Sequence, residues 1–197
     1  MTRLIIATQN QGKVKEIKEL LAGYNYEVLS LKEIGLDVDV VEDGSSFEEN
    51  SLIKARTIQD ITGGMVIADD SGIEIDFLHG APGIYSARFL GKVDDTKRCE
   101  GVLALLEGVS EPYRTARFRC VASLVSGTEA LTFHGTLEGR IAQEPQGENG
   151  FGYDPILFVP EFKKTVAQMD SETKNCISHR AKAFKLLTQE LINRSIP

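Results

Sequence analysis

The sequence predicts an α/β protein built on a mixed β-sheet. Strand-like and helix-like segments alternate at both ends of the 197-residue chain. Between these ends, the segments around 117–124 and 128–141 follow one another directly, as antiparallel strands do. Parallel strands instead need a long crossover, so the sheet should contain both kinds of pairing. A chain of this length most simply forms one compact unit of one or two lobes.

The first elements are a strand and a helix. An apolar run over 4–7 predicts a buried strand, and apolar residues at helical spacing after Lys13 predict a helix that ends at Gly23. One or two strands are expected over 27–41, with a turn at Gly35.

A capping box predicts the second helix. Ser46 is the expected N-cap, and Glu49 lies three residues on. The helix should end at Gly63-Gly64. Its expected apolar side consists of Leu52, Ile53, Ile58 and Ile61.

Two short strands are expected next. Residues 65–68 form an apolar run, and 69–72 read Asp-Asp-Ser-Gly, a composition that favours a turn. The alternation over 73–77 predicts a half-exposed strand that the glycines and proline of 80–83 end. The remaining expected elements are a helix over 96–106, strands over 117–124, 128–141 and 156–159, a glycine-rich loop over 147–154 and a final helix capped by Ser178 that bears Ala181, Phe184, Leu187 and Leu191.

Composition excludes several classes of protein. The net charge of −7 and the absence of a basic run argue against a nucleic-acid-binding surface. The three cysteines, Cys99, Cys120 and Cys176, fit neither a disulfide framework nor a zinc site. No segment is typical of a membrane span or a signal peptide. We therefore expect a soluble cytoplasmic protein that binds neither nucleic acid nor membranes.

The loop over 8–13 could bind a phosphate group. A strand that turns directly into a helix leaves backbone N–H groups and the positive end of the helix dipole facing one point. Thr8 and Asn10 can add donors, Gly12 allows close approach, and Lys13 adds a charge. A plain strand–helix connection is the equally open alternative.

Carboxylates could provide a metal site. Mg²⁺ prefers one or two carboxylates together with phosphate oxygens and water, and Glu42, Asp43, Asp69 and Asp70 supply such groups. Because neighbouring strand residues point to opposite faces, only one of Asp69 and Asp70 is expected to enter a given site. Read from composition alone, 69–72 is more simply a turn.

Two later segments could bind a base. Phe151 and Tyr153 among glycines can present a flat apolar face, and Asp154 can accept a hydrogen bond, although a core aromatic pair is equally consistent. His179 and Arg180 open the last helix, against the preference of the helix dipole, which suggests an anionic or carbonyl-bearing partner. An ordinary solvated helix start is the alternative. We interpret His79 and His134 as structural.

Taken together and in order, these segments resemble the inosine triphosphate pyrophosphatase family, which removes non-canonical purine nucleotides. The resemblance covers nearly the whole chain. Gln9 stands where the family often has glycine, and Cys176 where a basic residue is common. The matching segments are 8–13, Glu42 with 47–50 and 54–55, 68–72, 80–88, 150–155, and Lys174-Asn175 with 177–180.

The resemblance implies a fold and a reaction. The fold would be a single domain over 1–197, with an elongated twisted mixed sheet flanked by helices and two lobes with the active site in the cleft between them. The reaction would be Mg²⁺-dependent hydrolysis of the bond between the α- and β-phosphates of ITP, dITP or XTP, giving the monophosphate and pyrophosphate. A homodimer is expected.

The resemblance also assigns roles to residues. Asp70 would activate water, and Glu42 and Asp70 would hold the metal. Arg180→Ala is expected to lose both rate and the preference for inosine over guanine. The residues expected to bind substrate are Thr8, Gln9, Asn10, Gln11, Gly12, Lys13, Lys54, Ser71, Phe151, Gly152, Tyr153, Asp154, Lys174, His179 and Arg180. The alternatives are a pyrophosphatase of modified pyrimidine nucleotides and a non-catalytic nucleotide sensor.

Overall fold

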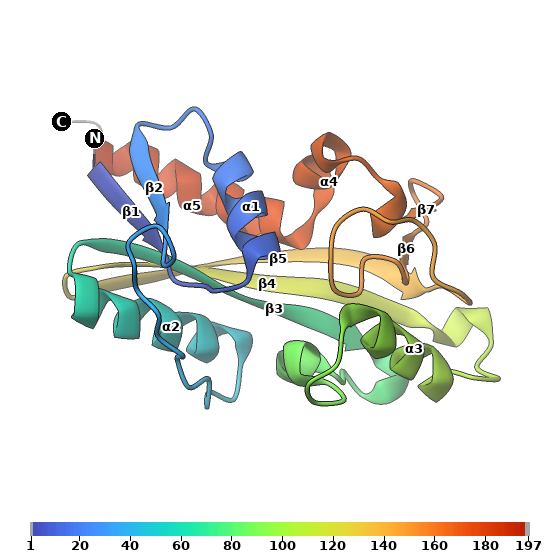
Figure 1. Ribbon diagram of the computed structural model, residues 1–197. Helices are drawn as coiled ribbons and strands as arrows, with labels where there is room; N and C mark the ends of the chain where they lie inside the picture. Colours follow the sequence, from blue (N-terminus) through green and yellow to red (C-terminus); the bar gives the residue numbers. More distant parts are fainter. Residues whose placement is uncertain (1, 196–197) are drawn as a thin grey trace. The chain divides into compact units, whose positions relative to one another are not determined.

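The structure is a computed structural model that describes residues 2–195 (Figure 1). Seven strands form one sheet in the order β2-β1-β3-β4-β5-β6-β7. The strands are β1 Thr2–Ile6, β2 Tyr26–Ser30, β3 Met65–Ile75, β4 Thr115–Ser126, β5 Glu129–Ile141, β6 Leu157–Val159 and β7 Lys164–Thr165. The helices are α1 Gln11–Leu20, α2 Phe47–Thr62, α3 Asp95–Leu105, α4 Ser171–Ile177 and α5 His179–Ser195, with short 3₁₀ turns η1 Asp76–Leu78, η2 Gly83–Arg88, η3 Glu111–Tyr113 and η4 Val166–Gln168.

The sheet is mixed, as the sequence predicts. Strand β1 pairs in parallel with both β2 and β3, with Leu4 opposite Val28 and Met65. Strand β6 pairs antiparallel with β5 and β7. The expected mixed α/β fold flanked by helices is therefore confirmed.

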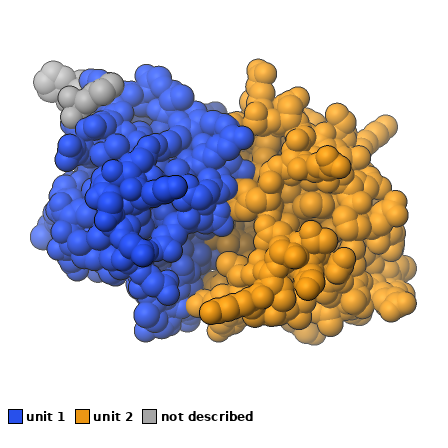
Figure 2. Space-filling model, in the orientation of Figure 1, with its two compact units in different colours: residues 1–70, 120–135, 180–197 blue, residues 71–119, 136–179 orange. Residues whose placement is uncertain are grey.

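The chain divides into two compact units, which Figure 2 colours separately. Unit 1 consists of residues 1–70, 120–135 and 180–197, and unit 2 of residues 71–119 and 136–179.

Unit 1 has an apolar layer on each face of its strands. Leu4 and Ile6 pack with α1 and α5, whereas Ile5 and Ala7 pack with α2. This alternation follows from the two-residue period of a strand. The expected core residues of the last helix, Ala181, Phe184, Leu187 and Leu191, are all buried.

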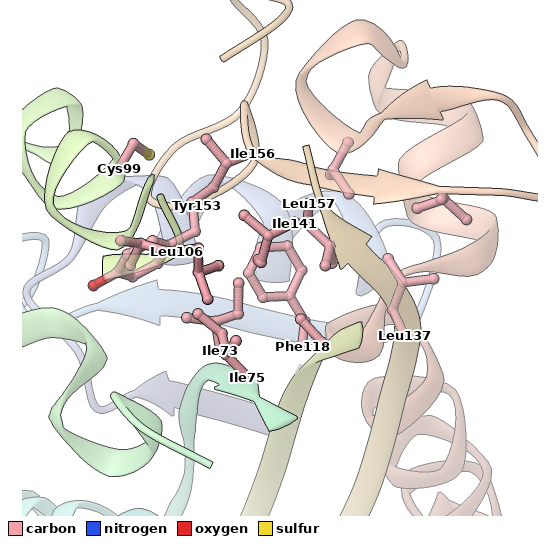
Figure 3. Packing of buried hydrophobic residues seen from close by; sticks show 14 of the residues in the cluster. Ile73, Ile75, Cys99, Leu106, Phe118, Leu137, Ile141, Tyr153, Ile156 and Leu157 are labelled. Atoms are coloured by element: carbon pink, nitrogen blue, oxygen red, sulfur yellow. The ribbon is translucent and has the colours of Figure 1, made fainter. Parts of the chain in front are cut away.

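Unit 2 is built around one apolar cluster, shown in Figure 3. Ile73 and Ile75 from β3, Phe118 from β4 and Leu106 after α3 meet there. Tyr153 belongs to the same cluster and is 6% exposed. The core therefore holds one residue of the glycine-rich loop directly.

Several expectations about local structure were wrong. Residues 65–75 form one continuous strand, so Asp69 and Asp70 lie within β3 and not in a turn. This strand lies between β1 and β4 in the sheet, and β1 pairs with its first residues, 65–67, so its place in the sheet outweighs the turn composition of 69–72. Phe77 lies in η1. The prediction of one or two strands over 27–41 with a turn at Gly35 is met by the single strand β2 and by the positive φ of Gly35, +70°.

The helix signals were partly correct. Helix α1 begins at Gln11, three residues earlier than expected, and Ser46 caps α2 by accepting from the Glu49 N–H group. Glu49 itself accepts from the backbone and hydroxyl of Ser45, so the capping box is incomplete. The buried side of α2 includes the polar residues Asn50, Ser51 and Lys54, and Ile61 is exposed. Helix α4 and strand β7 were not predicted.

Two composition-based observations also bear on the structure. Cys99, Cys120 and Cys176 are all free thiols. Within residues 2–195, no helix has both the length and the apolar character needed to cross a membrane.

Candidate active site

The loop between β1 and α1 is held by its own side chains. The Asn10 side chain accepts a hydrogen bond from the Lys13 N–H group at 3.1 Å and so caps α1. Thr8 accepts from the Asn10 N–H group through its hydroxyl at 3.2 Å. The loop thus presents the N-terminus of a ten-residue helix in a defined conformation.

Gln9 and Gln11 also stabilise this loop. The Gln9 amide donates to Asp37 at 3.1 Å and to the Val38 carbonyl at 3.0 Å, and Gln11 donates to the Gln9 carbonyl. Gln9, which departs from the family pattern, therefore joins the loop to the segment after β2.

A group of buried and partly buried charged side chains in unit 1 forms the charged cluster. It consists of Lys13, Glu16, Glu42, Lys54, Asp69, Asp70 and Arg180. At its centre, Asp69 accepts from Lys13 Nζ at 3.0 Å and from Arg180 Nη2 at 3.0 Å. Arg180 also donates to Glu16 through Nη1. Lys13 and Glu16 lie three residues apart on α1, so one helix face supplies both.

Asp69 was one of the candidate carboxylates, but the sequence reasoning assigned it no role. Burial alone would raise the pKa of the Asp69 carboxyl, but the nearby cations Lys13 and Arg180 hold it well below its ordinary value. Among the described residues, the second oxygen of Asp69, Oδ1, is buried with no hydrogen-bond partner. The available signal was the position of Asp69 beside Asp70 in the sequence. The composition of residues 69–72, however, favoured a turn.

Asp70 belongs to the other side of β3. Its Oδ1 lies 3.1 Å from Lys54 Nζ, and its Oδ2 accepts from the Asn50 side chain at 3.3 Å. As expected from strand geometry, Asp69 contacts residues of α1 and α5 whereas Asp70 contacts residues of α2. Burial raises the pKa of the Asp70 carboxyl above its ordinary value, although the positive charge of Lys54 opposes this shift.

Glu42 and Asp70, the predicted metal ligands, meet at one point. Lys54 Nζ lies 3.2 Å from Glu42 and 3.1 Å from Asp70. Within residues 2–195, no group of three or more His, Cys, Asp or Glu side chains could hold a metal ion. The donors at this point are two carboxylates, a set that suits Mg²⁺ when phosphate oxygens and water complete its shell.

The second group of predicted residues lies in unit 2. We call residues 149–154 the glycine loop. Gly150 and Gly152 have φ of +78° and +64°, which only glycine adopts without strain. Asp154 accepts from the Phe151 N–H group at 3.0 Å and pairs with Lys174, whose Nζ lies 5.2 Å from the centre of the Phe151 ring. The Tyr153 hydroxyl donates to the Ser86 carbonyl at 2.8 Å.

The structure distributes the predicted site residues between the two units. Ser71, at the start of the second unit, is partly buried. His179 is 6% exposed, with its ring 4.8 Å from that of Phe118. Unit 1 brings together Lys13, Glu42, Lys54, Asp70 and Arg180 with the 8–13 loop, and unit 2 brings together Phe151, Asp154 and Lys174.

A helix N-terminus, buried lysines and convergent carboxylates on an α/β scaffold are typical of enzymes that act on phosphorylated substrates. The chain matches the Ham1 family over residues 4–190 and belongs to this family.

Relatives with curated names cover almost the full chain. A protein of Desulforamulus reducens named dITP/XTP pyrophosphatase is 49% identical, with 98% of this chain and 96% of the relative aligned. A protein of Bacillus subtilis with the same name is 50% identical, with 97% and 98% aligned. Among solved structures, a HAM1 protein from Coxiella burnetii superposes with a TM-score of 0.89 at 41% identity and covers 98% of this chain and 100% of its own.

Proposed function

We propose that this protein hydrolyses non-canonical purine nucleoside triphosphates, dITP, ITP and XTP, to the monophosphate and pyrophosphate, and so cleanses the nucleotide pool. The names of its relatives support this substrate class. The observation that carries the proposal is the convergence of Glu42 and Asp70 on Lys54, in the unit that also presents the 8–13 loop. These parts supply what hydrolysis of a phosphoanhydride needs: positive charge, an anion-binding helix end and a proton acceptor.

The charged cluster would bind the triphosphate. Lys13 and the N-terminus of α1 place positive charge against phosphate oxygens, with side-chain donors from Thr8 and Asn10. Lys54 would add a second cation where Glu42 and Asp70 meet. These groups are preorganised, since each is already held by a cap or an ion pair, so little reorganisation is needed as charge develops.

Asp70 is the proposed acceptor of the proton of water. As the water oxygen attacks phosphorus, its proton passes to Asp70, the anhydride bond breaks and pyrophosphate leaves. Lys54 and Asn50 each bind one oxygen of the Asp70 carboxylate, so the group is held in one orientation for this role. Glu42 and Asp70 would hold Mg²⁺, which when bound neutralises phosphate charge and increases the acidity of water.

The glycine loop would bind the base. Phe151 can stack on a purine, and Asp154 and Lys174 lie beside it. Hypoxanthine and xanthine present an acceptor at O6, where adenine presents an amino donor. Donors from His179, Arg180 or the backbone would remain unpaired with adenine, at a cost of about 1–3 kcal/mol for each buried group.

The setting of the enzyme is part of the proposal. We propose a cytoplasmic homodimer that acts on free nucleotides, neither on nucleic acid nor at a membrane. The net charge of −7 supports this choice of substrate over a polynucleotide.

The test is pyrophosphate release from ITP, dITP, XTP, GTP, ATP and dTTP, with Mg²⁺ and after its removal by a chelator. We expect rapid cleavage of the first three, dependent on Mg²⁺. Asp70→Asn should lower kcat by about 10³-fold, because general-base catalysis contributes about 10²–10⁴-fold. Asp43→Asn is the matched control, since Asp43 is exposed beside Glu42 and should leave turnover unchanged.

Other outcomes would replace the proposal. Preferential cleavage of dTTP would indicate a pyrophosphatase of modified pyrimidine nucleotides. Tight binding of ITP without pyrophosphate release would indicate a sensor.

A further inference from the structure

Helix α3 holds both backbone polar groups of Gly152, the N–H and the carbonyl, which belong to two successive peptide units of the glycine loop. The Gly152 N–H group donates to Asp95 Oδ2 at 2.8 Å. The Cys99 thiol donates to the Gly152 carbonyl at 3.4 Å. Asp95 and Cys99 lie four residues apart, so they present neighbouring groups on one face of the helix.

Asp95 is oriented for this contact. It is the first residue of α3, where the helix dipole favours a negative charge. Its other oxygen, Oδ1, accepts from Arg98 at 2.8 Å, and Arg98 in turn donates to the Gly91 carbonyl at 3.3 Å. Because each carboxylate oxygen has a different donor, the side chain is held in one orientation.

The neighbouring acid, Asp94, has a separate task. Its side chain accepts from the Lys97 N–H group at 2.9 Å and caps α3. The two adjacent aspartates therefore have different contacts: Asp94 caps the helix, and Asp95 contacts the glycine loop.

Cys99 serves this arrangement as a thiol. It is 2% exposed, and burial raises its pKa to about 12, with the negative charge of Asp95 adding to the shift. The group is therefore protonated at neutral pH and can donate to the Gly152 carbonyl.

Gly152 has no side chain to anchor it, and its neighbour Phe151 carries the aromatic face of the loop. Tyr153 is fixed by the core and by its bond to Ser86, and Asp154 holds the Phe151 N–H group. The orientation of the Gly152 backbone, which joins Phe151 to Tyr153, is set by its two hydrogen bonds to α3. We propose that Asp95 is a positioning residue that fixes the Phe151 ring for stacking on the substrate base, an inference that rests on the proposed function.

Amide exchange tests the structural half of the proposal without requiring activity. In the full chain labelled with ¹⁵N-glycine, the Gly152 signal is assigned by its loss in Gly152→Ala. We expect Asp95→Ala to accelerate exchange of this amide at least tenfold, and Asp95→Asn, which keeps an acceptor, to lie between it and the unaltered protein. Asp94→Ala should lower Tm but leave Gly152 exchange unchanged.

Kinetics test the functional half. Asp95→Ala should raise KM for ITP about tenfold with kcat within twofold, because it removes a binding contribution common to ground state and transition state. Asp95→Asn should restore most of the affinity, and Asp94→Ala should leave KM unchanged. A merely structural role of Asp95 would instead reduce Tm without this split between KM and kcat.

Each outcome of the exchange and kinetic experiments either supports or overturns the proposed role of Asp95. Unchanged exchange of the Gly152 amide in Asp95→Ala would overturn the proposal, and so would faster exchange with an unchanged KM. If the unaltered protein fails to hydrolyse any purine nucleotide, the proposed function fails and this role with it. If the unaltered protein turns ITP over normally and Asp95→Ala has the same KM for ITP, only the role of Asp95 is overturned and the proposed function stands.

Discussion

The charged cluster and the glycine loop are built in opposite ways. In the charged cluster of unit 1, the charged side chains come from regular helices and a strand and form direct ion pairs: Asp69 with Lys13 and Arg180, and Asp70 with Lys54. The glycine loop of unit 2 is irregular, and the bonds that hold it run largely to its backbone N–H and carbonyl groups, from Asp95, Cys99 and Asp154.

The difference fits what each region is proposed to bind. Charge stabilisation depends steeply on distance and on low exposure, so groups that meet phosphate are best placed on rigid elements. A flat base needs a close approach of backbone and an aromatic face, which positive-φ glycines permit and a helix does not. The comparison teaches that the charged cluster, the proposed phosphate side, depends on charge balance, whereas the glycine loop, the proposed base side, depends on backbone geometry.

The largest expected effect comes from removing a charge from the cluster. Arg180→Ala leaves Asp69, already fully buried with one unpaired oxygen, without its guanidinium partner. Breaking a buried ion pair in this way costs about 3–5 kcal/mol of unfolding free energy. Urea unfolding measures this value.

The matched control for Arg180 lies on the same helix. Arg194 also pairs with two acids, Glu129 and Glu190, but its side chain is 22% exposed. Arg194→Ala should therefore cost less than about 1 kcal/mol. Equal losses of unfolding free energy in Arg180→Ala and Arg194→Ala would contradict the importance of buried charge balance.

The same Arg180 variant tests base selectivity. The sequence predicts that Arg180→Ala loses rate and the preference for ITP over GTP together. In the structure Arg180 donates to Asp69 and Glu16. A lower rate with an unchanged ratio of kcat/KM for ITP to kcat/KM for GTP would indicate that Arg180 acts by supporting Asp69. A reduced ratio would indicate that Arg180 contacts the substrate base.

An intermediate effect is expected from the loop geometry. A Cβ atom at Gly150 would lie 1.9 Å from Asp154 Oδ2, and Asp154 is buried and paired with Lys174. Gly150→Ala should therefore cost about 2–3 kcal/mol through strain and a displaced ion pair, with a raised KM for ITP. Unfolding and steady-state kinetics measure both.

Gly152 provides the comparison within the same loop. Its φ is also positive, but a Cβ atom there would meet no atom within 4 Å. Gly152→Ala should cost only about 1 kcal/mol, the penalty of the left-handed conformation. If both substitutions cost the same, steric contact with Asp154 is not what requires Gly150.

The smallest expected effect is a dependence on pH near the helix that carries Lys174. Asp170 caps α4, and its bonds to the backbone and side chain of Thr173 lower its pKa below the ordinary 3.8. Because the folded-state pKa is the lower one, the contribution of Asp170 is fully present above pH 3.8 and is lost as pH falls through the folded-state value. Asp170→Asn should lower Tm slightly at pH 7, and this difference should vanish in acid. A difference in Tm that persists below the folded-state pKa of Asp170 would contradict the role of the charge.

Much of the fold could be predicted because apolar periodicity reports burial directly. The residues after β1, the cap at Ser46 and the apolar face of α5 each carry a local signal that the tertiary structure obeys. Helix α4 escaped prediction because seven residues offer too few apolar positions for a period to show.

The sequence by itself determined the class of fold, the change from strand to helix through the 8–13 loop and the residue types available at the proposed site, since each depends on local pattern or composition. Only the tertiary structure decided which partners those residues have. Asp69 and Asp70 are adjacent in the chain, yet their place within β3 sends one to Lys13 and Arg180 and the other to Lys54. The contact of Asp95 with Gly152 joins residues 57 positions apart. Such pairings depend on strand continuity and long-range packing, which no local pattern records.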